Sequence, residues 1–450
     1  MVRITWLRPD ERIEHELRQL HEEGVPASDV AALARRWAEL RERHEHDAAG
    51  LRRAALTCLD EAAGLSRQAP AYDPPPELAT ALAGERRVSR RDVASLADRI
   101  EAAWTGRMAG CLLGKPVEKI PREGIRAILQ SIDEWPLRRY FTAVGVPSAV
   151  SERWPWNRAS RPTSMRENVV CMPEDDDVNY TMLALHVLET YGDGFTTDDV
   201  ATVWLQMLPP LTTFTAERVA MENLLAYVEP PATAHVGNPY REWIGAQIRS
   251  DLWGYVRPGD PAAAAELAWR DARLSHVENG VYGAILMAAM VALAFVETDP
   301  AQLVRRSLAL LPARSRLSEA VAWAVDVAER EPAWEHVLDA LHERLGGYHW
   351  VHAVNNAALV AAALVHGRGS FEASVTRAVM GGWDTDSNGA TVGSVCGAMH
   401  GVAGIPDAWS APLAGRVRSS LKGFDGRSID ELARRTLACV PAAYRAEVPA

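Results

Sequence analysis

The sequence predicts an all-α protein. From about residue 87 onward, apolar residues recur at helical spacing, and these patterns stop at pairs such as Pro209-Pro210 and Gly346-Gly347. Alternation of apolar and polar residues, which is typical of a half-buried strand, is scarce along the chain. The 450 residues are 48% apolar and 24% charged, the composition of a globular protein with a substantial core.

A helical extension is predicted to precede the main domain. Residues 8 to about 67 are rich in Glu, Arg, Leu and Ala, with apolar residues at helical spacing at Val30, Leu33, Trp37 and Leu40. The three consecutive prolines at 74–76 oppose helix formation and favour an extended connector. We therefore expect an N-terminal helical extension with a proline-rich linker at 1–76, and a main helical domain at 87–450.

Charge and cysteine content limit the partners and the compartment. The formal net charge is −11 and the isoelectric point is about 5.7, so nucleic-acid binding or membrane binding through bulk charge is disfavoured. The five cysteines are scattered without CxxC spacing, which supports neither a disulfide framework nor a zinc ribbon. Because the first residues also lack the apolar run of a secretion signal, we expect a cytoplasmic protein. The sequence predicts no particular oligomeric state.

Two further segments need separate interpretation. The longest apolar stretch, Val281–Val296, is shorter than the ~20 residues that a bilayer requires, so we expect a buried core helix. Residues 133–173 hold tryptophans, prolines and arginines without clear periodicity, and we expect a long loop. Ordered loops of this length are usually functional, and the sequence leaves open whether this one covers a site or packs on the surface.

Two predicted helices carry glycine at every fourth position. Glycine costs roughly 1 kcal/mol of helix stability relative to alanine, so such a stripe indicates backbones that approach closely. Neither helix is long and apolar enough for a membrane GxxxG pair, which leaves tight packing in a helical core as the preferred interpretation. The glycines are Gly106, Gly110 and Gly114 in one helix and Gly389, Gly393, Gly397 and Gly401 in the other.

Three acidic clusters flank these predicted helices: Glu118, the run 174–177, and the segment 384–387. Carboxylate and hydroxyl oxygens are ligands for Mg²⁺, Mn²⁺ or Ca²⁺ rather than for zinc. Taken alone, the acids of 175–177 are also explained as N-terminal helix caps. The segment that begins at Asp384 matches the first half of a calcium-binding EF-hand loop, but Val395 stands where that loop requires Glu, so an EF-hand is rejected.

From about Gly106 to Gly404, the chain resembles the ADP-ribosylglycohydrolase family. Segment 107–110, followed by Glu118, is similar to the family's opening helix and its acidic residue, and 381–388 (GGWDTDSN) is similar to its GG-DTD-[TS]-N signature. Segment 244–249 (IGAQIR) is similar to the family's NGAAMR segment, and the later Ser275-His276 to its Thr-His pair. These matches occur in the family's order along the chain.

The resemblance implies a compact all-α domain that holds two Mg²⁺ or Mn²⁺ ions and hydrolyses a glycosidic bond at the anomeric carbon of a ribose. Glu118 is the implied catalytic residue, as an acid, a base or a group that positions water. The implied metal ligands are Asp175, Asp176, Asp177, Asp384, Asp386 and Ser387. The implied substrate-binding residues are Arg249, His276, Gly382, Trp383 and Asn388.

The chain departs from the family pattern at several of these positions. The family reads Thr-Asp-Asp-Thr where this chain has Asp175-Asp176-Asp177-Val178, and we favour Asp176 and Asp177 as the aspartate pair, with Asp175 in the threonine position. Ile244 replaces an asparagine, and Trp383 is a large insertion beside the metal ligands. Structural alternatives also stay open: His276 as a buried histidine near a helix start, and Arg249 as an ion-pair partner of Asp251 and Asp260.

The predicted function is metal-dependent hydrolysis of an N- or O-glycosidic bond to ribose in an ADP-ribosyl or related ribosyl conjugate. One alternative is an enzyme with the same chemistry that acts on a small nucleoside-like metabolite. The other alternative is a non-catalytic ADP-ribose-binding protein. The sequence does not determine the leaving group or the physiological metal.

Overall fold

The computed structural model describes residues 4–84 and 91–446, and the protein is almost entirely helical within these ranges. Extended pairing in the described residues is limited to four isolated bridges. The all-α prediction is therefore confirmed. The expected domain limits at residues 87 and 450 lie outside the described residues.

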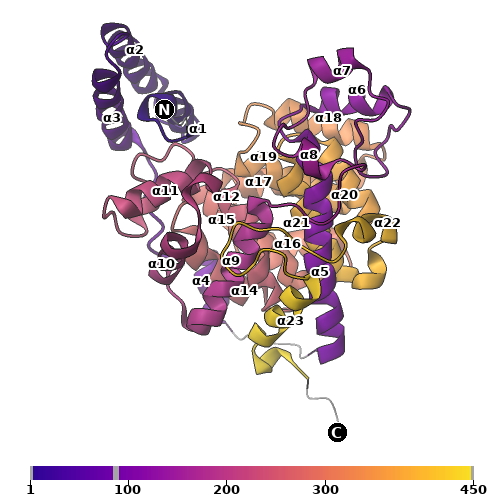
Figure 1. Cartoon of the computed structure of the whole chain (residues 1–450). Coiled ribbons are helices and arrows are strands. Elements are labelled where there is room, and N and C mark those ends of the chain that lie inside the picture. The colour runs from indigo at the N-terminus through magenta and orange to yellow at the C-terminus, as the bar shows by residue number, and fades with distance from the viewer. Residues whose placement is uncertain (1–3, 85–90, 447–450) are drawn as a thin grey trace.

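The first three helices form a bundle of their own at the upper left of Figure 1. They are α1 (Pro9–Glu22), α2 (Ala27–Arg43) and α3 (Ala48–Leu65), and Leu20, Trp37 and Cys58 are buried between them. The connector that follows has no regular secondary structure until α4 (Pro76–Ala83). The third proline thus starts a helix rather than extending the linker, because proline fits the first turn of a helix, where no backbone donor is needed.

The main body is organised around two helices in direct backbone contact, α5 (Val93–Gly114) and α21 (Thr385–His400). A Cβ atom built on Gly106 would meet the carbonyl oxygen of Gly393, and one built on Gly110 would meet that of Gly389, both well within 3.0 Å. Since later residues of α5 face earlier residues of α21, the two helices are antiparallel. This contact confirms that the glycine stripe serves close packing.

The predicted core helix is also present. It is α15 (Glu278–Ala294), whose residues are almost all buried, including the stretch from Gly283 to Ala294. Among the residues that the structure describes, no helix combines the length and the apolar character needed to cross a bilayer.

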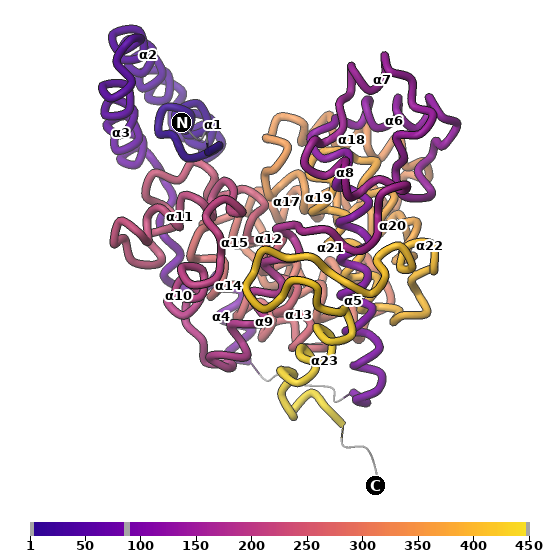
Figure 2. The backbone as a smooth tube through the Cα atoms, viewed as in Figure 1, coloured from indigo at the N-terminus to yellow at the C-terminus, as the bar shows by residue number. Residues whose placement is uncertain are grey.

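The remaining helices surround this centre, and Figure 2 shows the path of the backbone through them. On one side are α6 (Arg122–Gln130), α7 (Ser148–Arg153), α8 (Arg161–Ser164), α18 (Trp334–Leu345), α19 (Ala353–His366), α20 (Phe371–Met380) and α22 (Asp407–Ser410). The others are α9 (Asp176–Tyr191), α10 (Thr197–Met207), α11 (Thr215–Leu225), α12 (Gly245–Ile248), α13 (Asp251–Tyr255), α14 (Pro261–Ala272), α16 (Pro300–Leu308), α17 (Arg316–Arg330) and α23 (Ile429–Cys439).

The predicted loop at 133–173 is mostly irregular, although it contains the short helices α7 and α8. Its aromatic residues pack inward: Phe141 and Trp156 are buried, and their rings lie 6.1 Å apart. The loop therefore packs partly by its own aromatics, and its second half approaches the site described below.

The N-terminal bundle is attached to the main body by buried charged groups. The guanidinium of Arg241 pairs with Glu16 of α1 at 2.9 Å and with Glu23, which directly follows α1. The amide of Gln19 on the same helix donates to Glu242 at 2.7 Å. Because all these side chains are buried apart from water, the bundle is held at a defined position on the body.

The contact between α5 and α21 makes a stability prediction. Gly393→Ala should lower the free energy of unfolding by about 3 kcal/mol, because the new methyl group would overlap the backbone of Gly106. Gly64→Ala in α3 is the control, since no atom lies within 4 Å of its Cβ position. The free energy of unfolding of that variant should stay unchanged or rise by about 0.5–1 kcal/mol. Urea unfolding followed by circular dichroism measures both, and an unchanged midpoint for Gly393→Ala would contradict the close packing.

Candidate metal centre and active site

The antiparallel contact brings the end of α5 next to the start of α21. The hydroxyl of Thr385 donates to the carbonyl oxygen of Gly114 at 2.9 Å, which fixes the two helix ends together. A single turn then leads from α5 to Glu118. As a result, Glu118, Asp384 and Asp386 each offer a carboxylate oxygen, and these oxygens lie within 4.8 Å of one another.

The start of α9 supplies the third acidic cluster. Asp175 is the N-cap, and its Oδ1 accepts a hydrogen bond from the backbone of Asp177 at 2.9 Å. Asp177 reaches toward α21, where its Oδ2 accepts a hydrogen bond from the Ser387 hydroxyl at 3.2 Å. Asp176 is half-buried and lines the same cavity as Asp384 and Asp386. All three predicted acidic clusters therefore meet, with Asp175 in the capping position.

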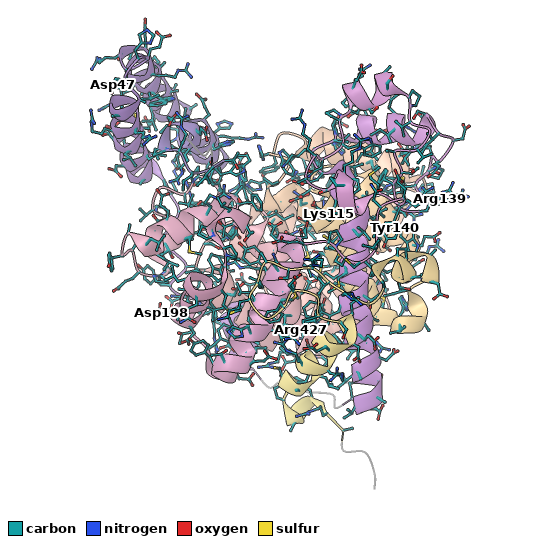
Figure 3. The ribbon with its side chains drawn as sticks, in the orientation of Figure 1. Asp47, Lys115, Arg139, Tyr140, Asp198 and Arg427 are labelled. Carbon is teal, nitrogen blue, oxygen red and sulfur yellow. The ribbon has the colours of Figure 1, made fainter. Side chains whose placement is uncertain are left out.

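Two buried cations compensate part of this negative charge. Lys115, at the end of α5 (Figure 3), pairs with Asp175 and donates to the carbonyl oxygen of Glu174 at 2.9 Å. Arg107, in the second half of α5, donates to the carbonyl oxygen of Asp177 and pairs with Asp251 at 2.6 Å. Arg107 lies on α5 and Lys115 directly follows its last residue, so the helix that carries the glycine stripe also positions the charge compensation.

Burial and neighbouring carboxylates shift the pKa values in this cluster. Burial raises the pKa of Asp386 to about 7, and the negative charge of Glu118 adds to this effect. Burial acts on Asp175 in the same direction, but the Lys115 ammonium outweighs it and lowers the pKa of that carboxyl. Burial, reinforced by adjacent carboxylates, raises the pKa well above its ordinary value in three further residues, Asp176, Asp177 and Asp384.

The donor set fits divalent cations. Asp177 Oδ1 is buried and accepts no hydrogen bond, although the Arg107 guanidinium lies 3.5 Å away. Asp384 occupies the N-cap position of α21 without making a side-chain capping bond. Unsatisfied buried carboxylate oxygens are costly unless a cation approaches them. Oxygen ligands of this kind suit Mg²⁺ or Mn²⁺.

A cavity of about 720 Å³ opens above these carboxylates. Glu118 lies at its base, where its carboxylate accepts a hydrogen bond from the Asn157 amide and lies 3.2 Å from the Lys119 ammonium. Loop residues between 157 and 173 line one side of the cavity. The other side is lined by aromatic residues, which are Trp6, Phe214 and Trp350.

Two of the predicted substrate-binding residues lie next to the metal-ligand segment but not on the cavity wall. Gly382 has a φ of +73°, and its Cβ position would approach the backbone of Arg122. Trp383 stacks on the imidazole of His342, with the rings 4.4 Å apart, and is buried. The tryptophan inserted into the family signature thus packs away from the cavity.

The other three are buried behind the wall. The Arg249 guanidinium pairs with Asp271 and Glu217, each at 2.7 Å. The expected pairs with Asp251 and Asp260 are therefore wrong. Because this guanidinium is buried, it requires carboxylate partners within the enclosed region where it lies. The side chains of His276 and Asn388 are also buried. The His276 ring contacts the Ser275 hydroxyl at 2.8 Å, and the Asn388 amide donates to Asn356 at 2.7 Å.

Sequence reasoning missed several residues that the structure brings to the site. Glu217 lines the cavity, and burial raises its pKa to about 7 despite the Arg249 partner. Trp6 and Phe214 lie far from every quoted motif, so no spacing pattern indicated them. Arg107 and Lys115 stand within the family-like opening segment, and their position among glycines was the available signal.

The architecture is that of an all-α protein with a candidate metal centre where two antiparallel helices meet. The ADP-ribosylglycohydrolase family model matches residues 92–445, and the chain therefore belongs to the ADP-ribosylglycohydrolase family. A solved structure described as an ADP-ribosylglycohydrolase-related protein complex is similar over 77% of this chain and 98% of its own, at 21% identity and a TM-score of 0.47. No curated protein matches this sequence.

The raised pKa values make a prediction about metal binding. In the metal-free protein, stability should fall as pH rises from about 4 to 7, because Asp386 ionises only near pH 7 in the folded state. A bound cation removes this loss, so Mn²⁺ should raise the melting temperature at about pH 7.5 and much less at about pH 5. At a hundredfold excess over Kd the gain corresponds to about 2.7 kcal/mol.

Thermal unfolding of matched variants tests this prediction. Asp384→Ala should lose most of the Mn²⁺-dependent shift, since that carboxylate makes no capping bond and its removal leaves α21 otherwise intact. Asp198→Asn, an exposed aspartate on α10 (Figure 3), removes a surface charge and should keep the full shift. Equal shifts in the two variants would mean that the ion binds elsewhere.

Proposed function

We propose that this protein is a metal-dependent glycohydrolase that cleaves an N- or O-glycosidic bond to ribose in an ADP-ribosyl or related ribosyl conjugate. Membership of a glycohydrolase family supports hydrolysis. The observation that carries the proposal is the convergence of Glu118 with the acidic clusters of α9 and α21 at the base of one cavity. The five cysteines are unpaired, in keeping with the cytoplasmic location we propose.

The residues that would hold two Mg²⁺ or Mn²⁺ ions are the carboxylates and the hydroxyl at the two helix starts, namely Asp176, Asp177, Asp384, Asp386 and Ser387, with Asp175 behind them. Bound ions of this kind orient ribose hydroxyls and lower the pKa of a coordinated water. Asp175 is already neutralised by Lys115 and caps α9, so its part is to fix Asp177. Ser387 links Asp177 to α21 and so holds the two ligand segments in register.

Glu118 is the proposed acid or base. Its side chain is 19% exposed and lines the cavity. Asn157 and Lys119 contact its two oxygens and orient the carboxylate toward the acidic cluster. A carboxylate in this position takes a proton from the attacking water, or stabilises positive charge at the anomeric carbon as the bond breaks.

Two variants separate metal binding from proton transfer. Asp386→Ala should lose the ion and with it both ribose binding and turnover. Glu118→Gln keeps the size and the hydrogen bond to Asn157 but accepts no proton, so ion binding and ADP-ribose affinity should change little while hydrolysis falls by roughly 10²-fold or more. Calorimetry with ADP-ribose and product release from Arg-, Ser- and base-linked ribosyl substrates measure both effects.

The same panel distinguishes the alternatives. A wild-type protein that binds ADP-ribose and cleaves nothing would be a binding protein, and the proposed hydrolysis would be wrong. Cleavage of base-linked substrates alone would identify a hydrolase of nucleoside-like compounds. Full activity of Glu118→Gln would show that Glu118 is not the acid or base, and the cavity would still be the proposed site.

A further inference from the structure

The N-terminal bundle contributes directly to the active-site cavity. Trp6, which precedes α1, lines the same cavity as Glu118 and Asp384. Residues 4–84 lie before the region that the family model matches, 92–445. One aromatic residue of the cavity lining, Trp6, therefore comes from a segment outside the region that the family model matches.

Trp6 is held at this wall by contacts with both the bundle and the body. Its ring lies 5.5 Å from His15 of α1 and 5.6 Å from each of Tyr240 and Trp243 of the body. The backbone carbonyl of the preceding residue, Thr5, accepts a hydrogen bond from Arg218 of α11. The position of Trp6 is thus set by contacts on two sides.

The bundle also braces the two body segments that form the wall beside Trp6. Ile244 donates its backbone N–H to Val351 at 2.8 Å, and both residues line the cavity. The same two segments carry the docking contacts, since Glu22 of α1 lies 3.3 Å from His352 and Gln19 donates to Glu242. The docking of the bundle therefore helps to fix the position of the two segments that form this wall.

We call the surface formed by Trp6, Phe214 and Trp350 the aromatic wall. Trp350 lies near Glu118, because the Lys119 ammonium sits 5.5 Å from the Trp350 ring and 3.2 Å from the Glu118 carboxylate. Phe214 is 40% exposed and contacts Arg218, which also binds Thr5. The aromatic wall accordingly extends from the candidate catalytic carboxylate to the N-terminal bundle.

The cavity carries little positive charge for a diphosphate. Eight carboxylates line it: Glu118, Glu174, Asp175, Asp176, Asp177, Glu217, Asp384 and Asp386. The three cationic side chains among the described lining residues already have carboxylate partners, in the pairs Lys115 with Asp175, Lys119 with Glu118, and Arg418 with Asp425. Even with two divalent ions at the ligands, an added diphosphate would have to compete for these cations.

We infer that the aromatic wall binds the planar aromatic group of an uncharged, nucleoside-like ribosyl substrate, and that Trp6 is a specificity-determining residue supplied by the N-terminal bundle. The inference rests on the proposed function for the bond that is cleaved. A planar base stacked on aromatic side chains gains roughly five- to 150-fold in affinity per base, independent of its hydrogen-bonding pattern. The metal centre then holds the ribose, and the aromatic wall selects what the ribose carries.

Binding of three probes to the full-length, Mn²⁺-loaded protein tests this inference: adenosine, ribose and ADP-ribose, measured by calorimetry and competition. We expect adenosine to bind at least tenfold more tightly than ribose, and ADP-ribose to gain nothing over adenosine. Trp6→Leu should weaken adenosine binding about tenfold and leave ribose binding within twofold. Phe214→Leu, at an exposed position where folding is not at risk, should act in the same direction.

Tyr227→Leu is the matched control, because this tyrosine is 95% exposed and does not line the cavity, so its affinities should equal the wild type. Equal adenosine affinity in Trp6→Leu, Phe214→Leu and wild type would overturn the aromatic wall. An equal loss of ribose and adenosine binding in Trp6→Leu and Phe214→Leu would assign both residues a structural role instead. ADP-ribose binding tenfold tighter than adenosine would overturn the nucleoside preference.

The hydrolysis panel separates this inference from the proposed function. If Trp6-dependent adenosine binding is found while no ribosyl substrate is cleaved, the proposed hydrolysis fails and the recognition of a planar group stands. If ribosyl substrates are cleaved with the same KM by Trp6→Leu and wild type, the inference fails and the proposed function stands. If wild type binds none of the three probes, the inference is wrong.

Discussion

Direct backbone contact between α5 and α21 is the constraint on which the candidate site depends. Where two helices touch through glycine, no side chain separates their axes, so their ends lie as close as their backbones allow. Because the helices are antiparallel, the end of α5 and the start of α21 coincide, and the Thr385 hydroxyl joins them. Glu118 and Asp384, distant in sequence, become neighbours. The partial positive charge at the start of α21 further favours carboxylates at that point.

The same helix pair makes the concentration of negative charge tolerable. An uncompensated buried carboxylate costs several kcal/mol, and the site holds more carboxylates than the protein's own cations neutralise. Arg107 on α5 and Lys115, which directly follows α5 about two turns further on, take up the charge of Asp177 and Asp175, respectively. The charge that they leave uncompensated is shared by Asp176, Asp177, Asp384 and Asp386, and the raised pKa values of these carboxyls mark the place where a cation would lower the energy.

The sequence was sufficient for those features that depend on local spacing. The all-α class, the close helix pair and the three acidic clusters all follow from residues a few positions apart. The register that puts Asp175 in the threonine position of the family motif stays a prediction, and the structure shows only that Asp175 caps α9. It was insufficient where a side chain's partner lies elsewhere in the chain. Arg249 turns away from the cavity because Glu217 and Asp271 enclose it, and Trp6 reaches the cavity only because the bundle docks there. Neither partner is visible in local sequence.

The bundle's attachment decides whether the cavity is formed before a substrate arrives. Arg241 is buried against Glu16 and Glu23, and separating the bundle from the body would leave charged groups buried without partners, at a cost of about 3–5 kcal/mol for each broken pair. A segment held in this way does not swing aside at low cost, so Trp6 stands at the wall in the free protein. Recognition of a planar group then requires little ordering of the protein, and the binding energy of the stacked ring is retained as affinity instead of being consumed by closure. The proposed metal ligands lie on α9 and α21, whereas Trp6 comes from the N-terminal segment, so under the proposed function these two parts of the cavity lining can vary independently.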